Sequence, residues 1–134
     1  SLPPGYVVVS EEILADDRRE LESLLKLICD RGTADVLITS GGTGLGPRDV
    51  TPQATLAIAD YEVPGIADAM RQHSARKVPT AILSRAVAVV RKRTLIINLP
   101  GSPTAVRETM GIIGPVLTHA LELLRGTAGE HAST

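Results

Sequence analysis

The sequence predicts a three-layer α/β fold, a mostly parallel sheet with helices on both faces. Apolar runs of strand length, rich in valine and isoleucine, alternate with longer stretches whose apolar residues recur at helical spacing. Two of the strand-like runs lead into a glycine turn and then a proline, which is typical of a loop that joins a strand to a helix. A chain of 134 residues with 43% hydrophobic composition suits one domain, which we assign to residues 1–126.

The chain is predicted to begin with a strand, a helix and a second strand. Tyr6–Val9 is a β-branched run of strand length. A helix is predicted from Asp17 to Gly32, because apolar residues recur at i, i+3, i+4 and i+7 at Leu21, Leu24, Leu25 and Ile28. The second strand is predicted over residues 34–40. The connection has the length of a right-handed crossover, so we expect the two strands to be parallel.

A glycine-rich segment follows the second strand and is predicted to hold an anion. Its glycines let the main chain adopt positive φ and approach a ligand closely; they are Gly41, Gly42, Gly44 and Gly46. Thr51 is expected to cap the next helix and Pro52 to be its first residue, so a positively polarised helix end would face a phosphate. A long irregular turn is the alternative that glycine content alone supports.

The remaining elements follow from apolar patterns and prolines. Helices are predicted from Pro52 to the break at 62–64, from Pro64 to His73, and from Pro103 to Gly126 with an interruption or bend near Gly114 and Pro115. Strands are predicted at Ala86–Val90 and Thr94–Leu99, joined by a turn at Arg91–Arg93. Residues 127–134 are small and polar and are predicted to form a flexible tail.

The segment after the last strand repeats the pattern of the glycine-rich one. Asn98 and Leu99 lead into a turn at Pro100 and Gly101, with Ser102 as the expected helix cap before Pro103. In open α/β sheets, ligands bind beyond the carboxyl ends of strands. We therefore expect the two loops to share one rim.

Charged and hydroxyl side chains near these loops suggest chemistry. Asp49 directly follows the anion loop, and a carboxylate there would repel a phosphate unless a cation such as Mg²⁺ lay between them. Asp16 is the natural second ligand, although it is equally suited to cap a helix. Arg48 is as suited to clamp a phosphate as to pair with Asp49. Ser84 could bind a ligand or satisfy a turn.

Composition argues against several other functions. Fourteen basic and fifteen acidic residues nearly balance, and the aromatic residues are only Tyr6 and Tyr61, so no nucleic-acid surface is expected. No apolar run approaches the ~20 residues of a membrane span. Cys29 stands alone, which suits a core residue in a reducing cytoplasm. Neither a zinc-ligand spacing nor a Gly-x-Ser-x-Gly motif is present.

Several motifs occur together and in order along the chain. Residues 41–55 read Gly-Gly-Thr-Gly-x-x-x-Arg-Asp-Val-Thr-Pro-x-Ala-Thr, and further motifs are Ala15–Asp17, Val63–Gly65, Ala81–Arg85 and Asn98–Pro103. From about Tyr6 to Gly126 the chain resembles the MogA/MoaB family of molybdenum cofactor biosynthesis, which includes the G domain of gephyrin.

This resemblance implies a cytoplasmic, molybdopterin-binding domain that is usually trimeric, with a hexamer as the alternative. It also implies an enzyme, a molybdopterin adenylyltransferase, which adenylylates molybdopterin with Mg-ATP and releases pyrophosphate. Asp16 and Asp49 match the family's essential acidic residues, which would be catalytic and hold Mg²⁺. Ligand contacts are expected from Gly41, Gly42, Thr43, Gly44, Arg48, Ser84, Pro100, Gly101 and Ser102. A MoeA-like molybdenum-inserting protein is the expected recipient of the product.

Two departures from the family pattern keep other functions open. Family members begin with a further strand and helix that contribute to the site, and we expect this first βα unit to be missing, either because the chain is a fragment or because those residues lie outside the sequence. Ala15 also replaces the family's proline. A non-catalytic molybdopterin-binding or carrier protein, similar to MoaB, is therefore the alternative to the enzyme. A generic nucleotide-binding regulator rests on the glycine loop alone.

Overall fold

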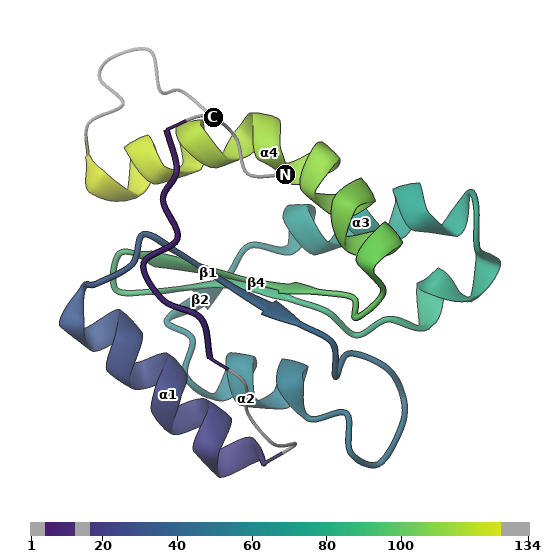
Figure 1. The fold of residues 1–134 in the computed structure, drawn as a ribbon, viewed down its shortest axis with the longest axis horizontal. Coiled ribbons are helices and arrows are strands. Elements are labelled where there is room, and N and C mark those ends of the chain that lie inside the picture. Colours follow the sequence, from purple (N-terminus) through teal and green to yellow (C-terminus); the bar gives the residue numbers. More distant parts are fainter. Residues whose placement is uncertain (1–4, 13–16, 127–134) are drawn as a thin grey trace.

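The chain folds into a sheet that helices cover on both faces (Figure 1). The computed structural model describes residues 5–12 and 17–126, so the predicted tail at 127–134 lies outside the described residues. Along the chain the elements are α1 (Arg18–Arg31), β1 (Val36–Ser40), α2 (Thr51–Ala57), β2 (Tyr61–Glu62), α3 (Pro64–Ala75), the 3-10 helix η1 (Pro79–Leu83), β3 (Ala88–Arg91), β4 (Thr94–Leu99) and α4 (Pro103–Arg125). This arrangement confirms the predicted α/β class.

The strands of the described sheet lie in the order β1-β4-β3-β2. β1 and β4 are parallel, in a register that places Val36 beside Leu95 and Ser40 beside Leu99. β2, β3 and β4 are joined by antiparallel pairing. Because β1 and β4 are parallel and in step, their carboxyl ends lie together at one edge of the sheet. Both predicted ligand loops begin at that edge.

Alternating side chains of β4 enter two hydrophobic cores. Leu95, Ile97 and Leu99 belong to the core that packs under α3 and α4. Ile96 belongs to the opposite core, together with residues of α1 and with Val89 of β3. Burying one aliphatic side chain of this size contributes roughly 1.5–3 kcal/mol, so β4 contributes strongly to the stability of both layers.

Helix α1 has the ends that its sequence predicts. The Asp17 carboxylate accepts a hydrogen bond from the Glu20 N–H at 3.1 Å, which caps the first turn. Gly32 follows the helix with φ of 66°, a left-handed conformation that favours glycine. Leu25 and Cys29 are the buried residues of this helix and face the sheet.

The predicted strand at Tyr6–Val9 is wrong, because residues 5–12 form no strand. Val7, Val8 and Val9 are 80%, 58% and 67% exposed. Figure 1 shows this segment as an extended purple trace between the α4 layer and α1. A groove of about 1000 Å³ is lined by the segment, β1, one side of α1 and the end of α4. A β-branched run becomes a strand only when a neighbouring strand pairs with it, and no strand of the described sheet pairs with this one.

The helix that begins at the glycine-rich segment is shorter than predicted, and its start also differs. It ends at Ala57 rather than near residue 62, because the following chain leaves it to pair with β3 as β2. The Asp60 N–H donates to the Val90 carbonyl at 2.8 Å, which extends this pairing. Val50, and not Thr51, is the N-cap, and no side chain caps this end. Thr51 is instead the first helical residue.

Two further differences lie in the second half of the chain. Residues after α3 form the 3-10 helix η1, which we did not predict. α4 runs continuously through Pro115, so of the predicted interruption or bend the interruption does not occur, while Figure 1 shows that the helix changes direction along its length. The 23 residues of this helix pack along the sheet through Met110, Ile113, Leu117 and Leu121, and this long contact compensates for the hydrogen bond that proline cannot donate.

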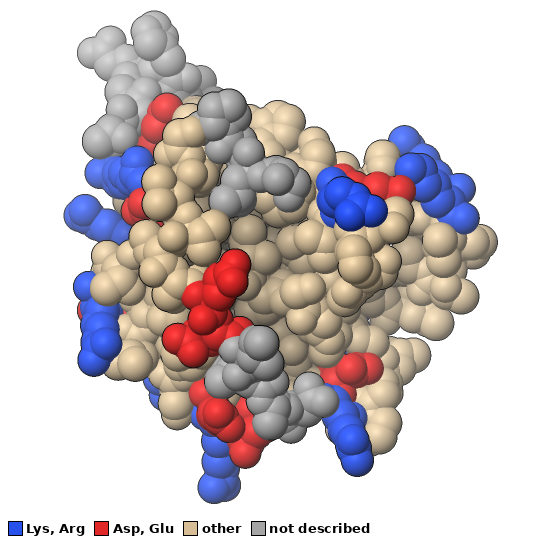
Figure 2. All heavy atoms as spheres, viewed as in Figure 1, with Lys and Arg blue, Asp and Glu red and all other residues tan. Residues whose placement is uncertain are grey.

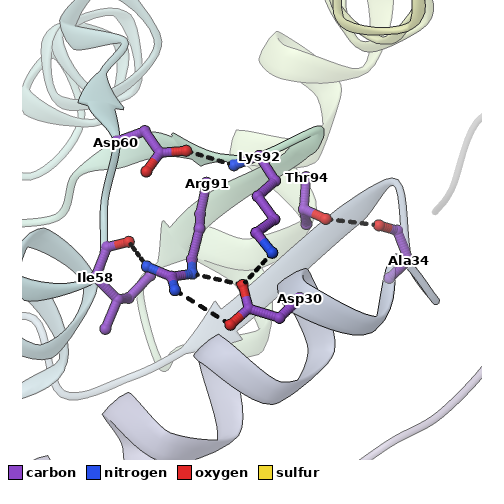
Figure 3. Close-up of polar contacts among 7 residues, drawn as sticks. All are labelled: Asp30, Ala34, Ile58, Asp60, Arg91, Lys92 and Thr94. Atoms are coloured by element: carbon purple, nitrogen blue, oxygen red, sulfur yellow. Dashed lines mark hydrogen bonds and ion pairs between the residues drawn. The ribbon is translucent and has the colours of Figure 1, made fainter.

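Of the three cations at 91–93, Arg91 is the last residue of β3, whereas Lys92 and Arg93 form the turn to β4, where Lys92 has a φ of 54°. Figure 3 shows Arg91 and Lys92 pointing toward Asp30 at the end of α1. Arg91 donates to both Asp30 carboxylate oxygens, at 3.0 and 3.2 Å, and to the Ile58 carbonyl at 2.9 Å. The Lys92 ammonium lies 3.4 Å from Asp30. Two of the cations therefore attach α1 to the hairpin.

Candidate functional site

Two loops meet at the edge where β1 and β4 end, as predicted. We call residues 41–49 the glycine loop and residues 100–102 the proline loop. The Gly41 N–H donates to the Leu99 carbonyl at 2.9 Å, and the Ser40 hydroxyl donates to the Pro100 carbonyl at 3.1 Å. A Cβ added at Gly101 would lie in van der Waals contact with the Gly41 Cα, at 3.4 Å, so the two main chains lie close together. A ligand at this edge can contact both loops at once.

The glycines of the glycine loop are required by its shape. Gly41 and Gly42 have φ of 89° and 70°, a region that other residues rarely adopt. A Cβ at Gly42 would also collide with the Thr51 hydroxyl. At Gly44 and Gly46, a Cβ would lie 2.9 Å from a carboxylate oxygen of Asp49. These glycines therefore make room for Thr51 and Asp49.

The Asp49 side chain folds back into the glycine loop. Its Oδ2 atom accepts a hydrogen bond from the Gly46 N–H at 2.9 Å, and its own N–H donates to the Gly46 carbonyl at 3.0 Å. Asp49 is half-buried. Oδ2 thus shapes the loop, and no hydrogen bond to Oδ1 is present within residues 5–12 and 17–126, so the structural role of Asp49 and a role in binding are compatible.

Arg85 contacts the glycine loop, and the sequence analysis did not single it out. Its N–H donates to the Thr43 carbonyl at 2.8 Å. Its guanidinium donates to the Gly44 carbonyl at 2.8 Å and to the Asp49 carbonyl at 2.6 Å. An arginine directly after Ser84, in an otherwise apolar stretch that precedes a strand, was the signal that could have identified it.

Asn98 ties together the elements beneath the loops and was also not identified. It is fully buried in β4. Its amide nitrogen lies 2.9 Å from the Thr39 hydroxyl in β1 and 3.1 Å from the Thr55 hydroxyl in α2, and its oxygen accepts from the Val87 N–H at 3.2 Å. The floor of the site is therefore a satisfied polar network, which fixes α2 relative to both strands.

The other predicted site residues differ in position. Asp16 lies outside the described residues. Arg48 is exposed, and no ion pair between it and Asp49 is recorded in the described ranges. The Ser84 hydroxyl accepts from the Ala86 N–H at 3.3 Å, which satisfies a turn. The Ser102 hydroxyl accepts from the Ala105 N–H at 3.4 Å and caps α4, as predicted.

The pKa values of Cys29 and Asp30, near the end of α1, are shifted from their ordinary values. Burial raises the pKa of the Cys29 thiol, so this cysteine is a core residue rather than a nucleophile. The hydrogen bond from Arg91 lowers the pKa of the Asp30 carboxyl. Among residues 5–12 and 17–126, no group of three or more His, Cys, Asp or Glu side chains lies close enough together to hold a metal ion.

On the face drawn in Figure 2, Lys and Arg lie dispersed around the periphery and form no broad basic area, while Asp and Glu lie partly beside them and partly in a run through the lower middle of the face. Within the described ranges, no helix is both long and apolar enough to cross a bilayer. A small anionic ligand held by the two loops fits this surface better than an extended polyanion.

Comparisons with known proteins show the family of this chain. Residues 4–119 match a family model described as "Probable molybdopterin binding domain". The molybdopterin adenylyltransferase of Haemophilus influenzae is 51% identical over 98 residues, which cover 73% of this chain and 50% of that protein. Among solved structures, the molybdopterin biosynthesis enzyme MoaB of Thermus thermophilus is 52% identical with a TM-score of 0.76, covering 83% of this chain and 70% of that one. The Mog protein of Mycobacterium ulcerans is 43% identical with a TM-score of 0.81, covering 86% and 74%. The chain thus spans half the length of the first of these relatives.

Proposed function

Because the chain belongs to the molybdopterin-binding domain family, we propose that the protein acts in molybdenum cofactor biosynthesis as a molybdopterin adenylyltransferase. The observation that carries the proposal is the contact between the glycine loop and the proline loop at Gly41 and Gly101. Two glycine-containing loops that meet at one sheet edge suit a ligand with more than one phosphate, because glycine lets the main chain approach a ligand closely. Molybdopterin-dependent release of pyrophosphate from Mg-ATP is the test.

The proposed reaction is a transfer of the adenylyl group. A phosphate oxygen of molybdopterin attacks the α-phosphorus of ATP, a new P–O–P bond forms, and the bond to pyrophosphate breaks as that group leaves with the electron pair. Such transfers need little covalent chemistry from a protein, because positioning and electrostatic stabilisation provide most of the acceleration. The two loops supply the positioning.

We propose ligand contacts from residues of both loops. Both loops lie at the sheet edge where β1 and β4 end, and their main chains can hold phosphates there. The proposed contacts are Gly41, Gly42, Thr43 and Gly44 in the glycine loop and Pro100, Gly101 and Ser102 in the proline loop. Arg48 is exposed and is not recorded as an ion-pair partner of Asp49 in the described ranges, which favours the role of a phosphate clamp over that of an internal pair. Ser84 is a weaker candidate, because its hydroxyl already accepts from the Ala86 N–H.

Asp49 is the proposed ligand of Mg²⁺, with Asp16 as its proposed partner. One oxygen of Asp49 accepts from the Gly46 N–H, and the second is of the type that Mg²⁺ prefers. Because Mg²⁺ keeps several waters, one or two carboxylates are enough to hold it next to phosphates. When bound, the ion would neutralise negative charge on the phosphates.

A molybdopterin-binding protein without catalysis is the second candidate. The loop-shaping hydrogen bond of Asp49 is the observation that favours it, since a residue with a structural role need not be catalytic. Binding of molybdopterin without pyrophosphate release would support the carrier. Release that depends on molybdopterin would support the enzyme.

We also propose that the protein is cytoplasmic and trimeric and passes its product to a MoeA-like molybdenum-inserting protein. Exposed apolar residues at η1, namely Val78, Ile82 and Leu83, support self-association, because such groups are normally covered. Light scattering at micromolar concentration distinguishes a trimer from a hexamer, and a stable monomer would contradict both.

A further inference from the structure

We propose that Arg85 is the positioning residue of the glycine loop. This proposal rests on the proposed function, because it assigns to Arg85 the task of keeping the glycine loop in the shape that receives phosphates and directs Asp49. Arg85 would act through the loop rather than touch the reacting atoms.

The contacts of Arg85 extend over most of the glycine loop, from Thr43 to Asp49. The guanidinium joins the carbonyls of Gly44 and Asp49, which are five residues apart, at 2.8 and 2.6 Å. The Arg85 N–H adds the Thr43 carbonyl at 2.8 Å. Hydrogen bonds from a charged donor are stronger than neutral ones, so the two hydrogen bonds from one guanidinium hold Gly44 and Asp49 at a fixed separation.

Arg85 is in turn held in place from α3. The Arg71 guanidinium donates to the carbonyls on either side of Arg85, that of Ser84 at 3.3 Å and that of Ala86 at 2.7 Å. Arg71 also pairs with Asp68 at 3.0 Å. Two arginines therefore connect α3 to the glycine loop in series, and the second of them is fixed before any ligand arrives.

The charge of Arg85 is directed to the glycine loop. Within the described ranges, no carboxylate is recorded as its ion-pair partner, and its contacts are main-chain carbonyls. Arg85 is half-buried, so solvent screens this charge less than at an exposed site. It therefore adds positive potential beside the loop while it holds the loop's shape.

The chemistry of the side chain makes the proposal specific to arginine. A guanidinium presents several N–H groups in one plane and can reach two carbonyls at once, whereas a lysine ammonium is a point charge on a flexible stem. Arg85→Lys keeps the charge and most of the stem but loses the fork. The corresponding control is Arg93→Gln, which removes a charge at the exposed hairpin turn far from the loop.

The experiment measures steady-state pyrophosphate release, melting temperature and amide hydrogen exchange for wild type, Arg85→Lys, Arg85→Ala and Arg93→Gln. We expect kcat of Arg85→Lys to fall about 10- to 100-fold, with a smaller change in KM for molybdopterin, because a misplacement of about 1 Å costs this much. Added guanidinium ion should partly restore Arg85→Ala. The Gly46 and Asp49 amides should exchange faster in both Arg85 variants, and the amides of β4 should not.

Two results would overturn the proposal. One is a kcat of Arg85→Lys equal to that of wild type, together with unchanged amide hydrogen exchange in the glycine loop. The other is a loss of activity that follows a general loss of melting temperature and is not restored by guanidinium. If the wild-type protein releases no pyrophosphate, the proposed function fails on that measurement alone, and the exchange of the Gly46 and Asp49 amides still decides whether Arg85 holds the loop.

Discussion

The Oδ2 atom of Asp49 lies 2.9 Å from the Gly46 nitrogen, and a Cβ at Gly46 would lie 2.9 Å from the same oxygen. The glycine and the carboxylate therefore depend on each other. The Gly46 N–H donates to the Asp49 carboxylate, and the carboxylate fits there only because Gly46 has no side chain. Asp49 shapes the loop and, in the proposed function, also faces a ligand, and substitutions can separate the two roles.

Asp49→Asn separates charge from shape. The asparagine carbonyl can still accept from the Gly46 N–H, so we expect the melting temperature to stay close to that of wild type. Adenylyl transfer should fall by on the order of 10² or more, as when one preorganised electrostatic contact is lost from a transition state. Molybdopterin binding should stay similar or tighten, because one negative charge is removed. Full activity in Asp49→Asn would mean that the carboxylate is structural.

Gly46→Ala tests the close approach directly. The new Cβ would lie against the Asp49 carboxylate, and overpacking of this kind costs about 1–3 kcal/mol of the free energy of unfolding. Gly65→Ala is the control, since a Cβ there meets nothing within 4 Å. In the Gly46→Ala/Asp49→Ala double variant, the cost of the alanine should largely disappear in urea unfolding. Additive effects of the two substitutions would contradict the contact.

Asn98→Ala removes the centre of the buried network beneath the loops. The Val87 N–H loses its acceptor, and two threonine hydroxyls lose a partner, so the free energy of unfolding should fall by about 1–3 kcal/mol. Thr104→Ala, at an exposed position, should change it little. Chemical denaturation measures both. A cost for Asn98→Ala no larger than that of the control would show that the network contributes nothing to stability.

The Asp30–Arg91 pair should make stability depend on pH. Arg91 lowers the folded-state pKa of Asp30 below its ordinary value of 3.8. The stabilisation is therefore present above the unfolded pKa and is lost as pH falls through the folded pKa. Asp30→Asn should be less stable than wild type at pH 6, and the difference should vanish in strong acid. Glu62→Gln is the control, and a difference for Asp30→Asn that stays constant down to pH 2 would refute the pair's role.

The parts of the fold that were predictable are those that local chemistry determines. Helix α1 begins after Asp17, which caps it, and ends before Gly32, which adopts the left-handed conformation. The positions of the two loops follow from the strand ends and from the glycines and prolines after them. The parallel register of β1 with β4 then brings the loops together. The prediction that both loops share one rim needed only these local signals and the general behaviour of α/β sheets.

The failures came from contacts between distant parts of the chain. Tyr6–Val9 has strand composition, but a strand exists only where a partner pairs with it. The end of α2 is set by pairing of β2 with β3, about thirty residues later, which local propensity does not report. Arg85 donates hydrogen bonds to main-chain carbonyls about forty residues earlier in the chain, and such contacts leave no periodic pattern in the sequence from which they could be predicted.

The most direct test of the account measures pyrophosphate released from Mg-ATP with and without molybdopterin, for wild type and for Asp49→Asn. The account predicts release by the wild type that requires molybdopterin, and a rate lower by on the order of 10² in Asp49→Asn at an unchanged melting temperature. Molybdopterin that binds to the wild type without any release of pyrophosphate would contradict the enzyme and leave the carrier.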